Sequence, residues 1–145
     1  MGYLTGTVSP ERTFEKGLDM RSMMPRFTGE ARRANWPVVE LLQQIGQPKG
    51  ATPGQVALAW LLARKPWIVP IPGTTSLSHL DENLTAGRVE LTPDDVKAIE
   101  ARYTSIRVQG ARSTEQLLAV HDVGANLGTS SAGAHGKTPL PKQTQ

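Results

Sequence analysis

The order of apolar and polar residues along the chain predicts four helices and one strand. Apolar side chains recur at the spacing of one helix face in Asn35–Gln47, in Leu77–Thr85 and in the segment that follows Thr92. Residues 56–63 are apolar at nearly every position, which is typical of a helix that is buried on all sides. Ile68–Ile71 is a short apolar run that predicts a strand. A strand between helices is typical of the α/β class, and we expect that class here.

Capping signals indicate where three of these helices begin. Asn35 is the expected N-cap of the first helix. Thr52 is followed by a proline at the first helical position and by a glutamine three residues on, which together predict a capping box. Thr92 precedes Pro-Asp-Asp, which is the same kind of start signal. The tryptophans lie at helix and strand positions and are expected in the core: Trp36, Trp60 and Trp67.

The two ends of the chain lack such patterns. Glycines and prolines interrupt residues 1–34, so we expect a loop region there. All the predicted elements fall in residues 35–112, and residues 113–145 form a C-terminal extension. From about residue 124 this extension has few large apolar side chains. Such a segment cannot bury enough surface to offset the entropy lost on ordering, so we predict that it is disordered.

Composition excludes several classes of protein. The chain has 145 residues, the length of one ordinary domain, and it has no cysteine, which excludes disulfides and thiolate metal sites. Its 16 basic and 13 acidic residues give a net charge of +3, and the basic residues are scattered. This distribution indicates a solvated surface rather than a nucleic-acid site. Because no long apolar run or signal peptide is present, we expect a cytoplasmic protein without a membrane or metal partner.

The segment Ile71–Asn83 is the best candidate for a binding site. Pro72-Gly73 ends the predicted strand, hydroxyl residues follow, and the next helix is expected to begin at a cap formed by Ser76 or Ser78. The N–H groups at the start of a helix that follows a buried strand bind phosphate in many α/β proteins. These residues alone leave two interpretations open: a phosphate site, or hydroxyl groups that only end a strand and cap a helix.

Five motifs, in the same order along the chain, resemble the C-terminal part of the aldo-keto reductases. They are Gly2-Tyr3-Leu4-Thr5-Gly6, Pro25-Arg26-Phe27, residues 52–62, Ile71-Pro72-Gly73-Thr74-Thr75 with Glu82-Asn83-Leu84, and residues 108–112. Members of this family reduce aldehydes or ketones with NADPH in a (β/α)8 TIM barrel. The resemblance implies a partial barrel that begins after the seventh strand and includes the last one. Because a TIM barrel needs about 250 residues, we expect an N-terminal barrel half as a complementary partner.

The resemblance also implies which residues bind NADP(H). The loop at the start of the chain approaches the pyrophosphate, Thr74 contacts the phosphate on the adenosine ribose, and Glu82 and Asn83 meet the adenine. Related sequences often have lysine at the position of Ser76 and arginine at the position of His79. An uncharged histidine binds phosphate less firmly than arginine does, so the preference between NADPH and NADH stays open. The implied cofactor-binding residues are Gly2, Leu4, Gly6, Ile71, Gly73, Thr74, Thr75, Ser76, His79, Glu82 and Asn83.

In this family the proton comes from a tyrosine that has aspartate, lysine and histidine partners, all in the first half of the barrel. Tyr3 and Tyr103 do not match the surroundings of that tyrosine. We therefore predict no catalytic residue in this chain, and no reductase activity for the chain alone. Two hypotheses follow. The chain is the NADP(H)-binding part of a truncated oxidoreductase, or it is a non-enzymatic remnant that binds a partner through exposed apolar helix faces.

Overall fold

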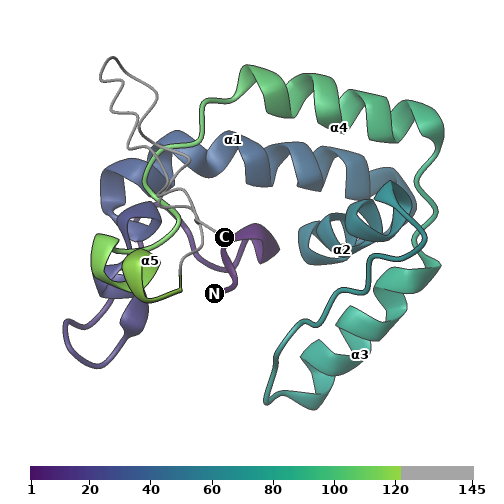
Figure 1. Ribbon diagram of the computed structural model, residues 1–145. Helices are drawn as coiled ribbons and strands as arrows, with labels where there is room; N and C mark the ends of the chain where they lie inside the picture. Colours follow the sequence, from purple (N-terminus) through teal and green to yellow (C-terminus); the bar gives the residue numbers. More distant parts are fainter. Residues whose placement is uncertain (122–145) are drawn as a thin grey trace, which may run out of the picture. The chain divides into compact units, whose positions relative to one another are not determined.

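The computed structural model describes residues 1–121, and this part of the chain consists of helices joined by loops (Figure 1). The chain divides into two units, Met1–Ser113 and a second that begins at Thr114. The second unit contains α5 (Glu115–His121), in which the Leu118 N–H donates to the Thr114 carbonyl. The disorder predicted from residue 124 lies outside the described residues.

The first unit is built from α-helices and short 3-10 helices. The α-helices are α1 (Gly29–Gly46), α2 (Pro53–Arg64), α3 (Leu77–Thr85) and α4 (Pro93–Ser105). The 3-10 helices are η1 (Tyr3–Thr5), η2 (Met20–Met23), η3 (Pro25–Phe27), η4 (Gln47–Lys49) and η5 (Ala86–Arg88). Helix α1 packs against both α2 and α4, and α2 also packs against α3 and η5.

Two helix starts confirm the capping signals in the sequence. At α2, the Thr52 hydroxyl accepts from the Gln55 N–H, and the Gln55 side chain accepts from the Thr52 N–H. Thr92 and Asp95 form the same reciprocal pair at the start of α4. Each box satisfies donors that a first helical turn cannot satisfy by itself, which is why both helices begin where the sequence predicts.

The predicted start of the first helix was wrong. Helix α1 begins at Gly29, because the Thr28 side chain accepts from the Ala31 N–H and so forms the cap. Asn35 lies inside the helix and does not cap it, and Pro37 follows within the helix. Pro37 lacks the N–H of a normal helical residue, so the helix lacks the hydrogen bond that this residue would otherwise donate to the Arg33 carbonyl. The last residues of the predicted loop region 1–34 are therefore helical.

Two hydrophobic clusters hold the first unit together. The larger lies where α1, α2 and α4 meet, and its buried members are Leu41, Leu42, Val56 and Ile99. The second fixes the N-terminal loops, and its buried members are Val8, Met24 and Phe27. Tyr3 and Phe14 pack against this second cluster, and both rings meet Phe27 edge to face. The residues before α1 are thus ordered by packing and not by regular hydrogen bonding.

The strand predicted at Ile68–Ile71 is not formed. Residues 65–76 are a connection between α2 and α3, and residues 1–121 contain no strand (Figure 1). A strand needs a neighbour that exchanges backbone hydrogen bonds with it, and the described chain offers none. Val69 and Ile71 are accordingly 78% and 91% exposed. The apolar pattern that predicts a buried strand is present, but its pairing partner is not.

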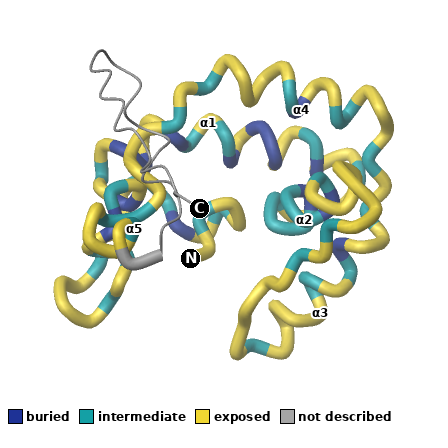
Figure 2. The backbone as a smooth tube through the Cα atoms, in the orientation of Figure 1, coloured by how far each residue is buried: buried dark blue, intermediate teal, exposed yellow. Residues whose placement is uncertain are grey.

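Helix α2 is buried or half-buried up to Trp60 and exposed over its last turn, which corrects the prediction of burial all round. Val56 and Ala59 are buried, whereas Leu61 and Leu62 are exposed (Figure 2). Trp67, expected in the core, is 73% exposed just beyond the helix. Helices α1 and α3 pack against α2, as do η1 and η5, and the described chain provides no sheet to cover its last turn.

A buried amide joins α1 to the segment after α4. The Asn35 Nδ2 donates to the Gln109 carbonyl at 2.9 Å, and its Oδ1 accepts from the Gln109 N–H at 2.7 Å. Nearby, Arg26 Nε donates to the Gly110 carbonyl at 3.2 Å. A Cβ on Gly110 would lie only 2.7 Å from the Pro25 carbonyl oxygen, so only glycine fits this close approach.

We expect Asn35→Ala to lower the free energy of unfolding by about 1–2 kcal/mol, because both hydrogen bonds to Gln109 are lost. Urea denaturation monitored by circular dichroism measures this change. Gln44→Ala is the matched control, since Gln44 is an exposed amide on the same helix. Equal losses in the two variants would show that the Asn35 bonds do not stabilise the fold.

An ion pair joins η4 to the start of α4. Lys49 Nζ lies 2.7 Å from Asp95 Oδ2, and that oxygen also accepts from the Thr92 N–H and hydroxyl. The hydrogen bond from Lys49, followed by the two from Thr92, lowers the pKa of Asp95. A carboxyl group with a lowered pKa in the folded state stabilises the protein above its ordinary pKa. That contribution is lost as the pH falls through the lowered value.

We therefore expect the stability of the chain to fall as the pH drops below about 4, the ordinary range of an aspartate. Asp95→Asn should reduce the slope of unfolding free energy against pH in this acid range. Urea titrations at several pH values between 2 and 6 measure the slope. The control is Asp94→Asn, because the Asp94 side chain is 94% exposed. An unchanged slope for Asp95→Asn would contradict the assignment.

Candidate functional site

The residues that the sequence singles out for cofactor binding lie in two places. Gly2, Leu4 and Gly6 belong to η1 and its caps, at the start of the chain. The others lie in the connection before α3 and in α3 itself. The first turn of α2 adjoins η1 and the part of α3 that contains Glu82.

The N-terminal turn has the backbone shape that its glycines allow. Gly2 and Gly6 have φ values of 74° and 78°, in the left-handed region that favours glycine. The Gly6 N–H donates to the Tyr3 carbonyl, and the Thr5 hydroxyl donates to the Gly2 carbonyl at 2.7 Å. Leu4 is exposed and Gly6 is half-buried. The turn is anchored by Tyr3, whose hydroxyl donates to the Arg32 carbonyl of α1.

The start of α3 is organised by hydroxyl groups. Thr74 Oγ1 accepts from the Ser76 N–H at 3.1 Å, and Ser76 Oγ accepts from the His79 N–H at 3.4 Å. Ser76 is therefore the N-cap, and its hydroxyl also lies 2.8 Å from that of Ser78. The N–H groups of Leu77 and Ser78 have no acceptor within the helix.

The remaining residues before α3 lie open to solvent. Ile71, Gly73, Thr74 and Thr75 are exposed, and a Cβ on Gly73 would touch nothing within 4 Å. His79 is exposed on the first turn of α3. Helix α3 contains Asp81 and Glu82 but neither lysine nor arginine. Backbone N–H groups, hydroxyls and the His79 imidazole are thus the groups that this turn offers to an anion.

The first turn of α2 joins the two candidate segments. The Thr52 hydroxyl donates to Glu82 Oε1 at 2.5 Å, and Gln55 Nε2 donates to the Glu82 carbonyl at 3.1 Å. A Cβ on Gly54 would lie 3.4 Å from a Thr5 methyl group and 3.7 Å from Glu82 Oε1. Gly54 thus lets η1 and α3 approach the same helix end. Glu82 is held in place, and Asn83 beside it is half-buried with no such partner in the described residues.

Sequence reasoning missed the role of Thr52 and Gln55 in holding Glu82. Both were recognised as capping residues, and that function explains their presence without reference to α3. The contact joins positions 30 residues apart, so no local pattern indicates it. Gly54 gave the one available signal, because a glycine in the first turn of a good helix is a sign of close approach.

The described residues show no built metal site and no membrane helix. Within residues 1–121, no three side chains of the types that bind metal come together. In the same range, no helix is both long and apolar enough to cross a bilayer.

Comparisons with known proteins identify the family. The sequence pattern of the aldo/keto reductase family matches residues 1–104. Aldo-keto reductase str7 from Strobilurus tenacellus is 37% identical over 112 residues, which cover 77% of this chain and 33% of that relative. The chain belongs to the aldo/keto reductase family. This finding confirms the resemblance carried by the sequence motifs.

A second member of the aldo/keto reductase family supports the same assignment. Aldo-keto reductase yakc [NADP(+)] from Schizosaccharomyces pombe is 39% identical over 111 residues, covering 77% of this chain and 32% of that relative. The chain therefore spans about a third of the length of the curated relatives it matches. No solved structure matches it. The family implies a (β/α)8 barrel, whereas residues 1–121 of this member fold as helices without a strand.

We expect Thr52→Ala to destabilise the chain by about 1–2 kcal/mol, because α2 loses its cap and Glu82 loses a hydrogen bond. Thr52→Ser retains the hydroxyl, so its free energy of unfolding should remain close to that of the unmutated chain. Urea denaturation compares the two, with Thr104→Ala as a control for an exposed threonine within a helix. If serine and alanine are equally destabilising, the methyl group and not the hydroxyl accounts for the effect.

Proposed function

We propose that this chain contributes the adenosine-binding part of an NADP(H) site to an oxidoreductase that reduces aldehydes or ketones. The observation that carries the proposal is the start of α3. There Ser76 caps the helix, Thr74 orders the turn before it, and two N–H groups point out of the helix without an acceptor. Membership of the aldo/keto reductase family supports the reaction class, and one relative has NADP(+) in its name.

The proposed site places the phosphate of the adenosine ribose at the first turn of α3. The hydroxyl groups of Thr74 and Thr75, together with the N–H groups of Leu77 and Ser78, supply hydrogen bonds to the phosphate oxygens. His79 adds one further donor on the same turn. The helix dipole favours the negative charge at this end, within the first turn only.

The adenine lies further along α3 in this proposal. Glu82 faces α2 through the bond between its Oε1 and Thr52, which leaves its other carboxylate oxygen to accept from an amino group such as that of adenine. Asn83 presents both a donor and an acceptor beside it. The segment Gly2–Gly6 supplies backbone N–H groups for the pyrophosphate, because its left-handed glycines leave the backbone open to close approach.

The proton for the reduction does not come from the described residues in this proposal. Tyr3 donates its hydroxyl to the Arg32 carbonyl, and burial raises its pKa, so it is a poor proton donor to a substrate. Tyr103 is half-exposed on α4. The expected complementary barrel half supplies the catalytic group, and it also covers the exposed apolar residues of the connection before α3.

A second function is favoured by that same exposed surface. Trp67, Val69, Ile71 and Leu77 are each more than 70% exposed and lie within eleven consecutive residues. Exposed apolar residues so close together are typical of an interface. An interaction module without cofactor binding is therefore the alternative to the proposed NADP(H) site.

The test is a fluorescence titration of NADPH and NADH against the 145-residue chain and its His79→Arg variant, each completed by a complementary N-terminal barrel half. Arginine forms charge-assisted bonds to phosphate, so the variant should bind NADPH about five- to thirtyfold more tightly. NADH lacks that phosphate and should change little. Gln44→Arg is the control, since it adds the same charge at an exposed position on α1.

Three outcomes separate the hypotheses. A selective gain for NADPH supports the phosphate site at α3. An equal gain for both cofactors, or an equal gain in the control, shows that residue 79 does not face the phosphate. Absence of binding by either cofactor favours the interaction module.

A further inference from the structure

Two arginine side chains converge on the first turn of α1, outside the candidate cofactor site. A Cβ on Gly29 would lie 3.6 Å from Arg33 Nη2 and 3.9 Å from Arg32 Nη2. Helical side chains tilt toward the N-terminus of their helix, so residues three and four positions along reach back over the first residue. Gly29 leaves the space between the two guanidinium groups unfilled by a side chain.

Arg32 is a buried cation without an anionic partner in the described chain. It is 5% exposed, its Nη2 donates to the Pro10 carbonyl at 3.1 Å, and its guanidinium lies 4.9 Å from the centre of the Phe14 ring. Its Nε has no hydrogen-bond partner, and no carboxylate of residues 1–121 forms an ion pair with it. A buried charge is costly unless it is paired, so the surroundings of Arg32 favour a bound anion.

Arg21, which contacts the same Phe14 ring, differs from Arg32 in having a carboxylate partner. Its guanidinium also lies on the Phe14 ring, at 4.6 Å, but Asp19 Oδ2 is 2.6 Å from its Nη2. The charge of Arg21 is therefore satisfied within the chain, and that of Arg32 is not.

The start of α1 adds further donors. The Thr28 hydroxyl accepts a hydrogen bond from the Ala31 N–H, and the Thr28 carbonyl accepts one from the Arg32 N–H. The N–H groups of Gly29 and Glu30 are left without an acceptor in the helix. Because α1 has 18 residues, its N-terminal end has a full helix dipole, which favours an anion. The Glu30 side chain is exposed and forms no ion pair with either arginine in the described chain.

We propose that the first turn of α1 binds a phosphate group, either free or on a small organic monoester. Arg33 and Arg32 supply guanidinium donors, and Gly29 and Glu30 supply backbone N–H groups. The planar fork of a guanidinium suits phosphate oxygens. This site is distinct from the phosphate site proposed at α3, since the first turn of α1 and helix α3 lie at different ends of the first unit (Figure 1).

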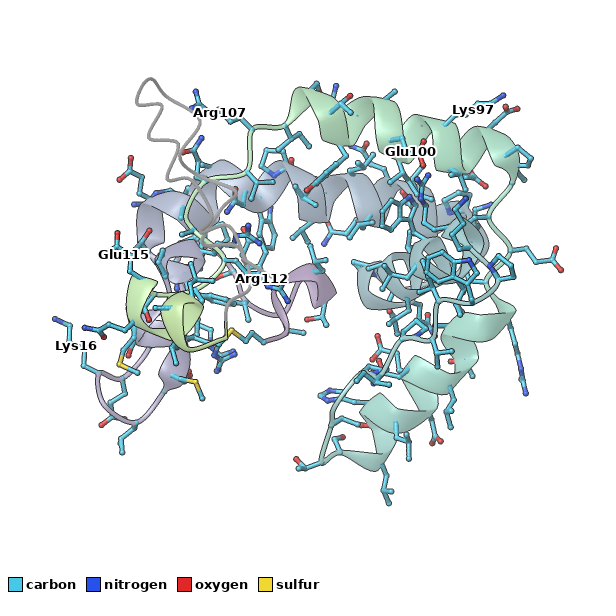
Figure 3. All side chains as sticks on the ribbon, viewed as in Figure 1. Lys16, Lys97, Glu100, Arg107, Arg112 and Glu115 are labelled. Carbon is cyan, nitrogen blue, oxygen red and sulfur yellow. The ribbon has the colours of Figure 1, made fainter. Side chains whose placement is uncertain are left out.

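The test is a titration of the full chain with inorganic phosphate at constant ionic strength, followed by two-dimensional NMR. We expect the amide signals of Gly29 and Glu30 and the Nε–H signal of Arg32 to shift together and to saturate. Arg33→Gln should weaken the affinity about three- to fivefold, as for an exposed ion pair. Arg107→Gln is the control, because Arg107 is an exposed arginine after α4 (Figure 3).

A parallel titration with glycerol phosphate identifies the source of the phosphate. Equal affinity for the two compounds assigns the site to the free anion, and tighter binding of the monoester assigns it to an organic ligand. Unsaturable shifts, or equal weakening by Arg107→Gln, would overturn the proposal. If the amides of Leu77 and Ser78 respond while those of Gly29 and Glu30 do not, the α1 site is wrong and the α3 site stands.

Discussion

The first unit depends on the burial of one long helix. Helix α1 supplies Leu41 and Leu42 to the cluster that it forms with α2 and α4. Its first half contacts the N-terminal loops through Trp36, which meets the Tyr3 ring edge to face, and through the Tyr3 hydroxyl bond to Arg32. A helix of this length is about 27 Å long, enough to span both clusters. Helices α2 and α4 pack directly against α1, as do η1, η3 and η4, whereas α3 and η5 pack against α2.

The polar contacts of the unit fix segments that the hydrophobic clusters leave free. Asn35 of α1 forms hydrogen bonds with the chain after α4, and Lys49 of η4 pairs with Asp95 in the first turn of α4. Arg64 of α2 forms an ion pair with Glu100 of α4, which is labelled in Figure 3. Each of these polar contacts contributes at most about 1–2 kcal/mol, but together they select one arrangement of the helices.

The two proposed anion sites lie at the N-termini of α3 and α1. They differ in the charge of the side chains around them. At α3 the donors are N–H groups, hydroxyls and an imidazole, and the helix has acidic residues further on. At α1 two arginines surround the first residue, and one of them is buried. The first arrangement suits a ligand that is held mainly by contacts elsewhere, such as a dinucleotide. The second suits a compact phosphate that supplies the missing counter-charge.

Much of the local structure could be predicted from the sequence. The starts of α2 and α4 follow from Thr52 and Thr92, because a capping box is complete within four residues. The extent of α3 follows from its apolar spacing, and family membership follows from motifs that keep their order. The roles of the implied NADP(H) residues stay predictions, since no contact in the described chain tests them.

Strand formation, helix burial and long-range contacts were decided by the tertiary structure, because each depends on residues that are distant in the sequence. Ile68–Ile71 has the apolar character of a strand, but a strand exists only where a neighbour pairs with its backbone. Residues 56–63 are apolar on every side, yet residues 61–63 at the end of this run are exposed. The bond between Thr52 and Glu82 and the approach of two arginines to Gly29 join groups whose positions no local pattern fixes. Sequence determines which groups can cap, pack or bind, and the fold alone determines which of them meet.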